Sequence, residues 1–202
     1  LYGRLDLAYD GSGPAKLLEY NADTPTALFE SAVVQWDWLE QGMARGVLGP
    51  GCDQFNSLHE RLIAAFAQLR APSPYRLHLA CVQSSAEDKG TVDYLMDCAA
   101  QAGLDARFTY IEEIGLLSDG RFCDGANQAI ETLFKLYPWE WLFREGYAAN
   151  LATSRCQFVE PPWKALLSNK GLLACLWEME PGHPNLLPAF FENDPRCASL
   201  SP

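Results

Sequence analysis

Two apolar runs separated by a helical segment constrain the fold of this chain more than any other feature. The run at 77–82 is compact and apolar, as is typical of a buried strand, and a second strand is predicted at 107–111. Residues 89–102 between them have the pattern of a helix. This alternation predicts an α/β fold of mixed α+β character, with parallel pairing and a Rossmann-like β-α-β unit.

The N-terminal part is predicted to form a hairpin followed by two helices. Strands at 2–9 and 15–21 flank a short loop that is rich in turn-forming residues. Apolar side chains then recur at helical intervals over 27–42 and 55–69. A segment with two prolines at 71–74 breaks the chain and predicts a boundary.

The C-terminal part is predicted to contain two further helices and one strand. The first helix covers 127–151 and is interrupted by Pro138, the strand covers 157–160, and the second helix covers 164–179. We therefore expect three successive parts, which are residues 1–72, 73–153 and 154–202.

Charge and composition exclude several classes of function. The formal net charge is -11, and such a chain lacks the basic surface that nucleic-acid backbones require. No apolar run reaches the roughly 18 residues of a membrane span, and no secretory leader is recognisable. Seven cysteines without a C-x-x-C motif favour reduced thiols over disulfides or zinc. We expect a cytoplasmic protein that acts on small molecules, without nucleic-acid or membrane partners, and a sequence cut at both ends.

The first hairpin carries an unusual pairing of charges. Side chains on a strand alternate between faces. In the register where Tyr9 opposes Lys16, Asp6 lies across from Glu19. Two facing carboxylates destabilise a hairpin unless something compensates their charge. The sequence therefore predicts a compensating cation at this point.

Magnesium would suit the polar face of this hairpin. It prefers oxygen ligands, and one or two protein carboxylates commonly bind it together with phosphate oxygens and water. Asp6, Glu19 and the amide of Asn21 supply such oxygens, while Arg4 supplies a planar cation for a phosphoryl group. The alternative is an ordinary solvated hairpin face.

Three further groups of residues could contact ligands. Thr24 and Thr26 precede a helix, where hydroxyls bind anions or simply cap the helix. Glu87 and Asp88 follow a strand, where they could hold an ammonium group or serve as first-turn acids. Lys170 could neutralise a nucleotide phosphate, although it could equally be a surface lysine.

Five motifs extend over nearly the whole chain: YGRLD at 2–6, KLLEYNADTPT at 16–26, FVEPPWK at 158–164, LSNK at 167–170 and HPNLLP at 183–188. They resemble the glutathionylspermidine synthase family, in its synthetase region without an amidase domain. The resemblance implies an ATP-grasp-type ligase in which ATP activates a carboxylate as an acylphosphate and an amine then displaces phosphate. The acid would be glutathione or a similar peptide, and the amine a polyamine or another amine. A non-catalytic nucleotide- or polyamine-binding domain on the same scaffold is the alternative.

The resemblance also implies roles for individual residues. Residues 73–153 would form a substrate-side subdomain, and residues 154–202 would begin the nucleotide-binding lobe. A cysteine of the family is replaced by Ala27, and further ATP-binding residues are expected beyond Pro202, so this stretch alone is expected to be inactive. The implied roles are two Mg²⁺ ions on Asp6, Glu19 and Asn21, the transferred phosphoryl group on Arg4, ATP on Lys170, and substrates on Thr24, Thr26, Glu87 and Asp88.

Overall fold

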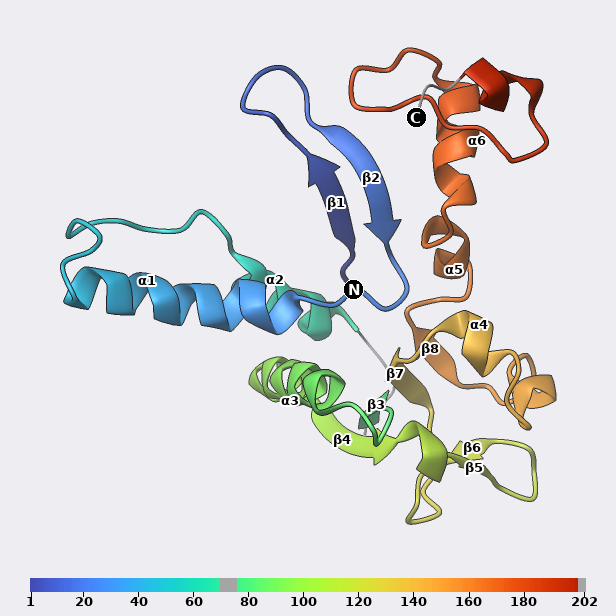
Figure 1. Ribbon diagram of the computed structural model, residues 1–202. Helices are drawn as coiled ribbons and strands as arrows, with labels where there is room; N and C mark the ends of the chain where they lie inside the picture. Colours follow the sequence, from blue (N-terminus) through green and yellow to red (C-terminus); the bar gives the residue numbers. More distant parts are fainter. Residues whose placement is uncertain (70–75, 200–202) are drawn as a thin grey trace. The chain divides into compact units, whose positions relative to one another are not determined.

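The computed structural model describes residues 1–69 and 76–199 (Figure 1). Contacts divide the chain into two compact units. The larger contains Thr26–Glu160 together with Leu1, and the smaller joins Tyr2–Pro25 to Pro161–Pro202. The three successive parts expected from the sequence stay a prediction, and the boundary expected at 71–74 lies outside the described residues.

A four-stranded parallel sheet forms the centre of the larger unit. Strand β3 (Arg76–Cys81) pairs on one side with β4 (Asp105–Tyr110) and on the other with β7 (Thr132–Leu136), which in turn pairs with β8 (Gln157–Val159). Helix α3 (Ala86–Gln101) connects β3 to β4. The predicted β-α-β unit and parallel pairing are confirmed.

The long helix predicted at 127–151 is wrong. Residues Thr132–Leu136 form β7 instead, and all five are buried. A central strand of a parallel sheet is covered on both faces, so it has no alternation that would distinguish it from a buried helix. Two short elements follow it, α4 (Trp139–Leu142) and the 3-10 turn η3 (Ala148–Asn150).

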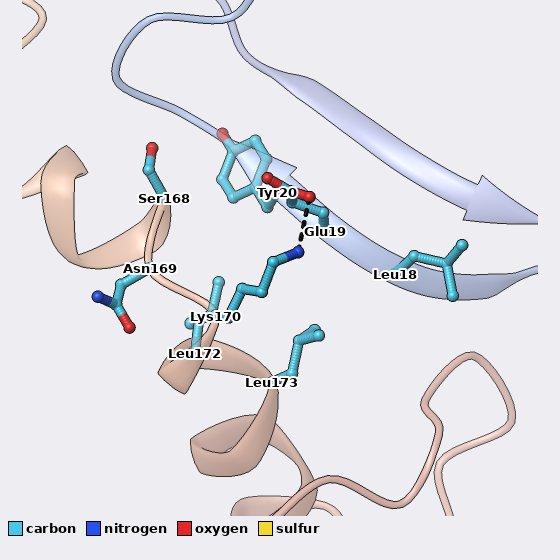
Figure 2. A pocket seen from close by; sticks show the side chains of 8 residues that line it. All are labelled: Leu18, Glu19, Tyr20, Ser168, Asn169, Lys170, Leu172 and Leu173. Carbon is cyan, nitrogen blue, oxygen red and sulfur yellow. Dashed lines mark hydrogen bonds and ion pairs between the residues drawn. The ribbon is translucent and has the colours of Figure 1, made fainter. Parts of the chain in front are cut away.

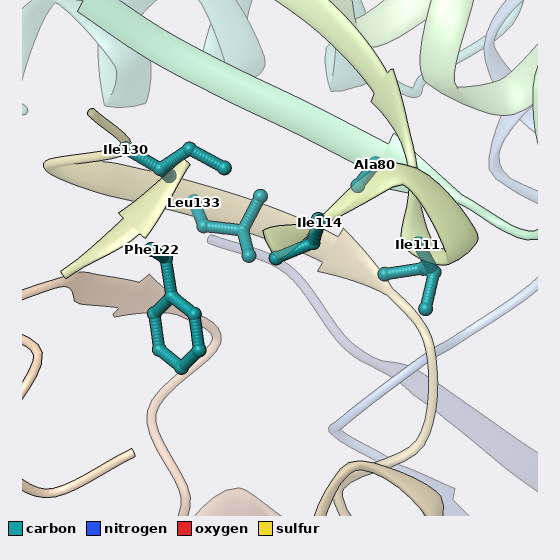
Figure 3. Close-up of a cluster of buried hydrophobic side chains, with 6 residues drawn as sticks. All are labelled: Ala80, Ile111, Ile114, Phe122, Ile130 and Leu133. Atoms are coloured by element: carbon teal, nitrogen blue, oxygen red, sulfur yellow. The ribbon is translucent and has the colours of Figure 1, made fainter. Parts of the chain in front are cut away.

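A hydrophobic cluster fixes the short hairpin of the larger unit against this sheet (Figure 3). The hairpin consists of β5 (Gly115–Leu116) and β6 (Phe122–Cys123). The ring of Phe122 meets those of Tyr147 and Phe158 edge-on, at centroid distances of 5.4 and 6.0 Å. The buried members of the cluster are Ala80, Ile111, Ile114, Phe122, Ile130 and Leu133.

The helices predicted at 27–42 and 55–69 are also present. The first begins with a π-helical stretch, η1 (Glu30–Val34), and continues as α1 (Gln35–Ala44). The second is α2 (Leu58–Gln68), and it packs on α3, where His59 Nδ1 lies 3.1 Å from the hydroxyl of Tyr94. No helix within residues 1–69 and 76–199 is both long and apolar enough to cross a bilayer.

The smaller unit is built on the antiparallel hairpin of β1 (Arg4–Ala8) and β2 (Lys16–Asn21). Asp6 pairs with Glu19, which confirms that part of the predicted register. A β-bulge then shifts the register, so Lys16 pairs with Ala8 and not with Tyr9 as predicted. The extra residue that a bulge inserts explains this shift, which alternation alone does not reveal.

The helix predicted at 164–179 is divided in two. Helix α5 (Lys164–Leu167) ends at Ser168, and α6 (Gly171–Met179) begins after Lys170. The chain later returns to the hairpin, and its described part closes with the 3-10 turn η4 (Pro195–Ser199). Three bonds tie residues 184–185 to the hairpin: Leu17 N donates to Asn185 O at 2.8 Å, Asn185 Nδ2 to Ala15 O at 2.8 Å, and Lys16 Nζ to Pro184 O at 2.5 Å.

Candidate functional site

Four polar side chains converge on one face of the β1–β2 hairpin. Arg4 donates to both carboxylate oxygens of Asp6, with Nε 2.7 Å from Oδ1 and Nη2 3.0 Å from Oδ2. With the amide of Asn21 oriented to satisfy its neighbours, its oxygen accepts from Arg4 Nη2 at 2.9 Å. Its nitrogen then donates to Glu19 Oε1 at 3.0 Å. The predicted convergence of these residues is therefore confirmed.

The two facing carboxylates are compensated by cations of the chain itself. The hydrogen bond from Arg4 lowers the pKa of Asp6, and the same bond raises the pKa of Arg4. Asp6 therefore stays a carboxylate at neutral pH. The repulsion expected between Asp6 and Glu19 is thus offset before any ligand arrives.

Lys170 lies against the hairpin, as predicted (Figure 2). Its Nζ donates to Glu19 Oε2 at 2.9 Å, and the two side chains are 75% and 30% exposed. The surrounding pocket has no room for a water molecule. A ligand that enters between Lys170 and Glu19 would therefore have to separate the ion pair, whereas the exposed ammonium of Lys170 is open to solvent. The pocket is lined by Leu18, Glu19, Tyr20, Ser168, Asn169, Lys170, Leu172 and Leu173.

Ser168 is a residue of this site that the sequence reasoning did not single out. Its Oγ accepts hydrogen bonds from the backbone N–H groups of Ala22 and Asp23, both at 2.9 Å. One signal was available, because a serine at a break between two helical segments commonly bonds to backbone. The sequence could not predict which residues Ser168 contacts, because they lie about 145 positions earlier in the chain.

The four residues expected to contact substrates are divided between the units. Thr24 belongs to the smaller unit, whereas Thr26, Glu87 and Asp88 belong to the larger one. Glu87 and Asp88 lie in the first turn of α3, directly after β3, and Ser85 caps this helix by accepting from Asp88 N at 3.1 Å. They lie near the point where the chain order reverses across the sheet, which is a common ligand position in open α/β sheets. Glu87 and Asp88 could therefore bind an ammonium group, or they could simply be acidic residues in the first turn of a helix.

The side-chain oxygens of the hairpin are of the type that binds magnesium together with a nucleotide. Within residues 1–69 and 76–199, no group of three or more His, Cys, Asp or Glu side chains is arranged to hold a metal. Asp6 and Glu19 offer carboxylate oxygens and Asn21 offers an amide oxygen. These oxygens now accept from Arg4, Lys170 and the Asn21 amide, so the ion would have to replace those partners. Magnesium usually takes one or two carboxylates and completes its shell with phosphate oxygens and water. The set does not form an all-protein cage.

Sequence comparison decides the family. Residues 1–200 match the family described as glutathionylspermidine synthase preATP-grasp. The chain belongs to this family. The membership confirms the resemblance of its motifs and agrees with the mixed α/β fold and its parallel sheet.

The relatives of this family member include proteins named as ligases and synthetases. The chain is 50% identical over 196 residues to a "Putative acid–amine ligase" of Haemophilus influenzae, covering 95% of this chain and 48% of that protein. It is 27% identical to the bifunctional glutathionylspermidine synthetase/amidase of Escherichia coli, with 94% and 33% covered. It is 26% identical to the trypanothione synthetase of Crithidia fasciculata, with 94% and 32% covered. The chain spans about half or a third of the length of these proteins.

Proposed function

We propose that this chain is part of an ATP-dependent acid–amine ligase, and that its hairpin binds the phosphates of ATP together with magnesium. The observation that carries the proposal is the convergence of Arg4, Asp6, Glu19 and Asn21 with Lys170. A solvated hairpin face would not need a bidentate arginine, two carboxylates and a lysine from another element. Phosphoryl transfer needs such a set, because positioning and charge supply most of its catalysis.

The proposed reaction has two steps. The γ-phosphoryl group of ATP passes to a carboxylate oxygen of the acid, which gives an acylphosphate and ADP. The amine then attacks the acyl carbon, so that a C–N bond forms and the C–O bond to phosphate breaks. The products are an amide, free phosphate and the proton that the amine loses.

Each residue of the hairpin site would have a separate task. Asp6, Glu19 and the amide oxygen of Asn21 would hold magnesium, which supplies positive charge next to the phosphates. Arg4, whose Nε and Nη2 now bond Asp6, would exchange this partner for two phosphoryl oxygens, which its planar guanidinium suits. Lys170 would act as a mobile point charge on the nucleotide.

The ion pair between Lys170 and Glu19 is compatible with these tasks. It is solvent-exposed, and exposed pairs contribute about 0–1 kcal/mol. Exchanging it for contacts to magnesium and phosphate therefore costs little. The pair would keep both side chains close to their working positions before ATP binds.

The proposed substrates are a thiol peptide and an amine. The names of the Escherichia coli and Crithidia relatives support glutathione or a similar peptide as the acid and a polyamine or other amine as the nucleophile. Thr24 and Thr26 are the proposed contacts for the peptide. Glu87 and Asp88 are the proposed contacts for ammonium groups, whose charge they would balance.

Amine-dependent release of ADP by the full-length parent protein tests this function. The protein is incubated with Mg-ATP, glutathione and a panel of polyamines and simple amines, and the amide product is identified by mass spectrometry. We expect ADP release that requires both acid and amine. Binding of Mg-ATP without turnover for any pair would support a non-catalytic binding domain instead.

A further inference from the structure

The hydroxyl of Ser168 joins two parts of the smaller unit at a partly buried position. It accepts hydrogen bonds from the N–H groups of Ala22 and Asp23, which are 0% and 6% exposed. A buried N–H without a partner is costly, and a hydroxyl oxygen has two lone pairs with which to accept both. One side chain thus satisfies two backbone donors.

Both ends of helix α5 hold the hairpin next to its polar face. At the first residue of α5, Lys164 Nζ donates to Tyr2 O at 3.2 Å, two residues before Arg4. At the other end, Ser168 binds the backbone that directly follows Asn21. Helix α5 therefore contacts the chain beside the open end of the hairpin, where Arg4 pairs with Asn21.

A tight turn connects Ser168 to Lys170. Asn169 Oδ1 accepts from Gly171 N at 2.8 Å, which closes the turn around the lysine. A Cβ atom added at Gly171 would lie 3.0 Å from Asn169 Oδ1 and 3.3 Å from a ring carbon of Phe191, so the turn is tightly packed. A shift at Ser168 would consequently move Lys170 as well.

We infer that Ser168 is a positioning residue. Its hydroxyl holds the backbone next to Asn21 at a fixed distance from the turn that carries Lys170. The inference rests on the proposed function. The ion pair of Lys170 with Glu19 would exchange partners when Mg-ATP binds, whereas the Ser168 bonds use no group that is proposed to bind ATP. They persist through the reaction and keep the hairpin and the lysine turn aligned.

The test compares two substitutions in the full-length parent. Ser168→Ala removes the acceptor, while Ser168→Thr keeps it. A displacement of about 1 Å can cost on the order of a hundredfold in rate, so we expect Ser168→Ala to lower amine-dependent ADP release about ten- to a hundredfold. It should also raise the magnesium concentration needed for half-maximal rate. Ser168→Thr should restore both values, and Ser118→Ala, at an exposed serine between β5 and β6, should change neither.

Amide hydrogen exchange at Ala22 and Asp23 provides a readout that does not depend on activity. We expect faster exchange in Ser168→Ala than in the wild type, and no change in Ser118→Ala. If Ser168→Ala does not fold, Ser168→Cys replaces it, because sulfur is a weak acceptor of similar size. A wild type without ligase activity would contradict the proposed function. Amide exchange at Ala22 and Asp23 would still show whether the Ser168 hydrogen bonds form. Unchanged exchange, or faster exchange with unchanged rate and magnesium dependence, would overturn the role of Ser168.

Discussion

Lys170 Nζ donates to Glu19 Oε2 at 2.9 Å, across 151 residues of sequence. The lysine proposed to meet a phosphate is therefore paired with the carboxylate proposed to meet magnesium. The pair neutralises both charges, while the lysine side chain stays 75% exposed. Ligand binding at this site is expected to be an exchange of partners, with little rearrangement of backbone.

Replacing Lys170 should weaken nucleotide binding without affecting the fold. We expect Lys170→Met to lower the affinity for Mg-ATP about ten- to a hundredfold, because a hydrogen bond to a charged group contributes about 1.5–3 kcal/mol. Stability should change by less than about 1 kcal/mol, since the pair is exposed. Isothermal titration calorimetry and urea unfolding of the full-length parent measure the two values. Lys89→Met, which removes another solvent-accessible ion pair, is the control and should keep wild-type affinity.

Glu19→Gln should abolish catalysis and leave the folded state almost unchanged. The substitution keeps the size of the side chain and removes the charge proposed to bind magnesium. We expect amine-dependent ADP release to fall at least about a hundredfold, with apo stability within about 1 kcal/mol of the wild type. Glu40→Gln, at an exposed position of α1, should retain full activity. Full ligase activity in Glu19→Gln would remove Glu19 from the site.

Arg4→Gln should raise the pKa of Asp6 toward its ordinary value of 3.8. The pKa of Asp6 is lowered in the folded state, first by its hydrogen bond with Arg4. Asp6 therefore favours the folded state above its unfolded pKa, and this contribution is lost as the pH falls through the folded pKa. A carboxyl ¹³C NMR titration measures the midpoint directly. Asp119, whose pKa is lowered mainly by the backbone N–H of Arg121, serves as internal control and should titrate identically in both proteins.

His78 should make the protein less stable as the solution becomes acidic. The side chain is 0% exposed, its Nε2 lies 3.3 Å from Asp124 Oδ2, and its Nδ1 has no hydrogen-bond partner among residues 1–69 and 76–199. Burial lowers the pKa of His78 below its ordinary value of 6.5. The unfolded chain therefore takes up a proton that the folded chain does not, and stability present above pH 6.5 is lost as the pH falls below it.

Urea unfolding between pH 7.5 and pH 5.5 measures this slope, at pH values chosen about one unit on either side of the ordinary histidine pKa. His78→Gln should be less stable at pH 7.5, yet its stability should depend less on pH. His183→Gln, at an exposed position, should keep the wild-type slope. Equal slopes in the wild type and His78→Gln would show that another group causes the effect.

Phe122→Ala should strongly destabilise the larger unit. The ring is 1% exposed and packs in the cluster that joins the β5–β6 hairpin to the sheet. Large-to-small substitutions of a buried Phe cost about 3–5 kcal/mol, because a cavity remains. Leu116→Ala lies on the same hairpin but is 43% exposed, so it should cost much less. Thermal unfolding measures both, and a loss at Phe122 similar to that at Leu116 would contradict its place in the core.

The sequence by itself determined the β-α-β unit and the residue types on the polar face of the first hairpin. The β-α-β unit was predictable because its strands and helix differ in length and apolar pattern along the chain. The pairing of Asp6 with Glu19 followed from the register that we assumed, but this register is wrong next to the loop, and the bulge between Asp6 and Leu7 restores the pair. The motifs of the family were likewise readable as continuous runs.

Tertiary structure decided β7, the bulge in β2 and the partners of Ser168 and Lys170. Residues 132–136 form a strand because β3 and β8 flank them, and a segment buried on both faces carries no local signal of its type. Ser168 and Lys170 meet residues about 150 positions earlier. Such contacts depend on how separate elements pack, since side-chain periodicity describes one element and contains no information about which other element covers it.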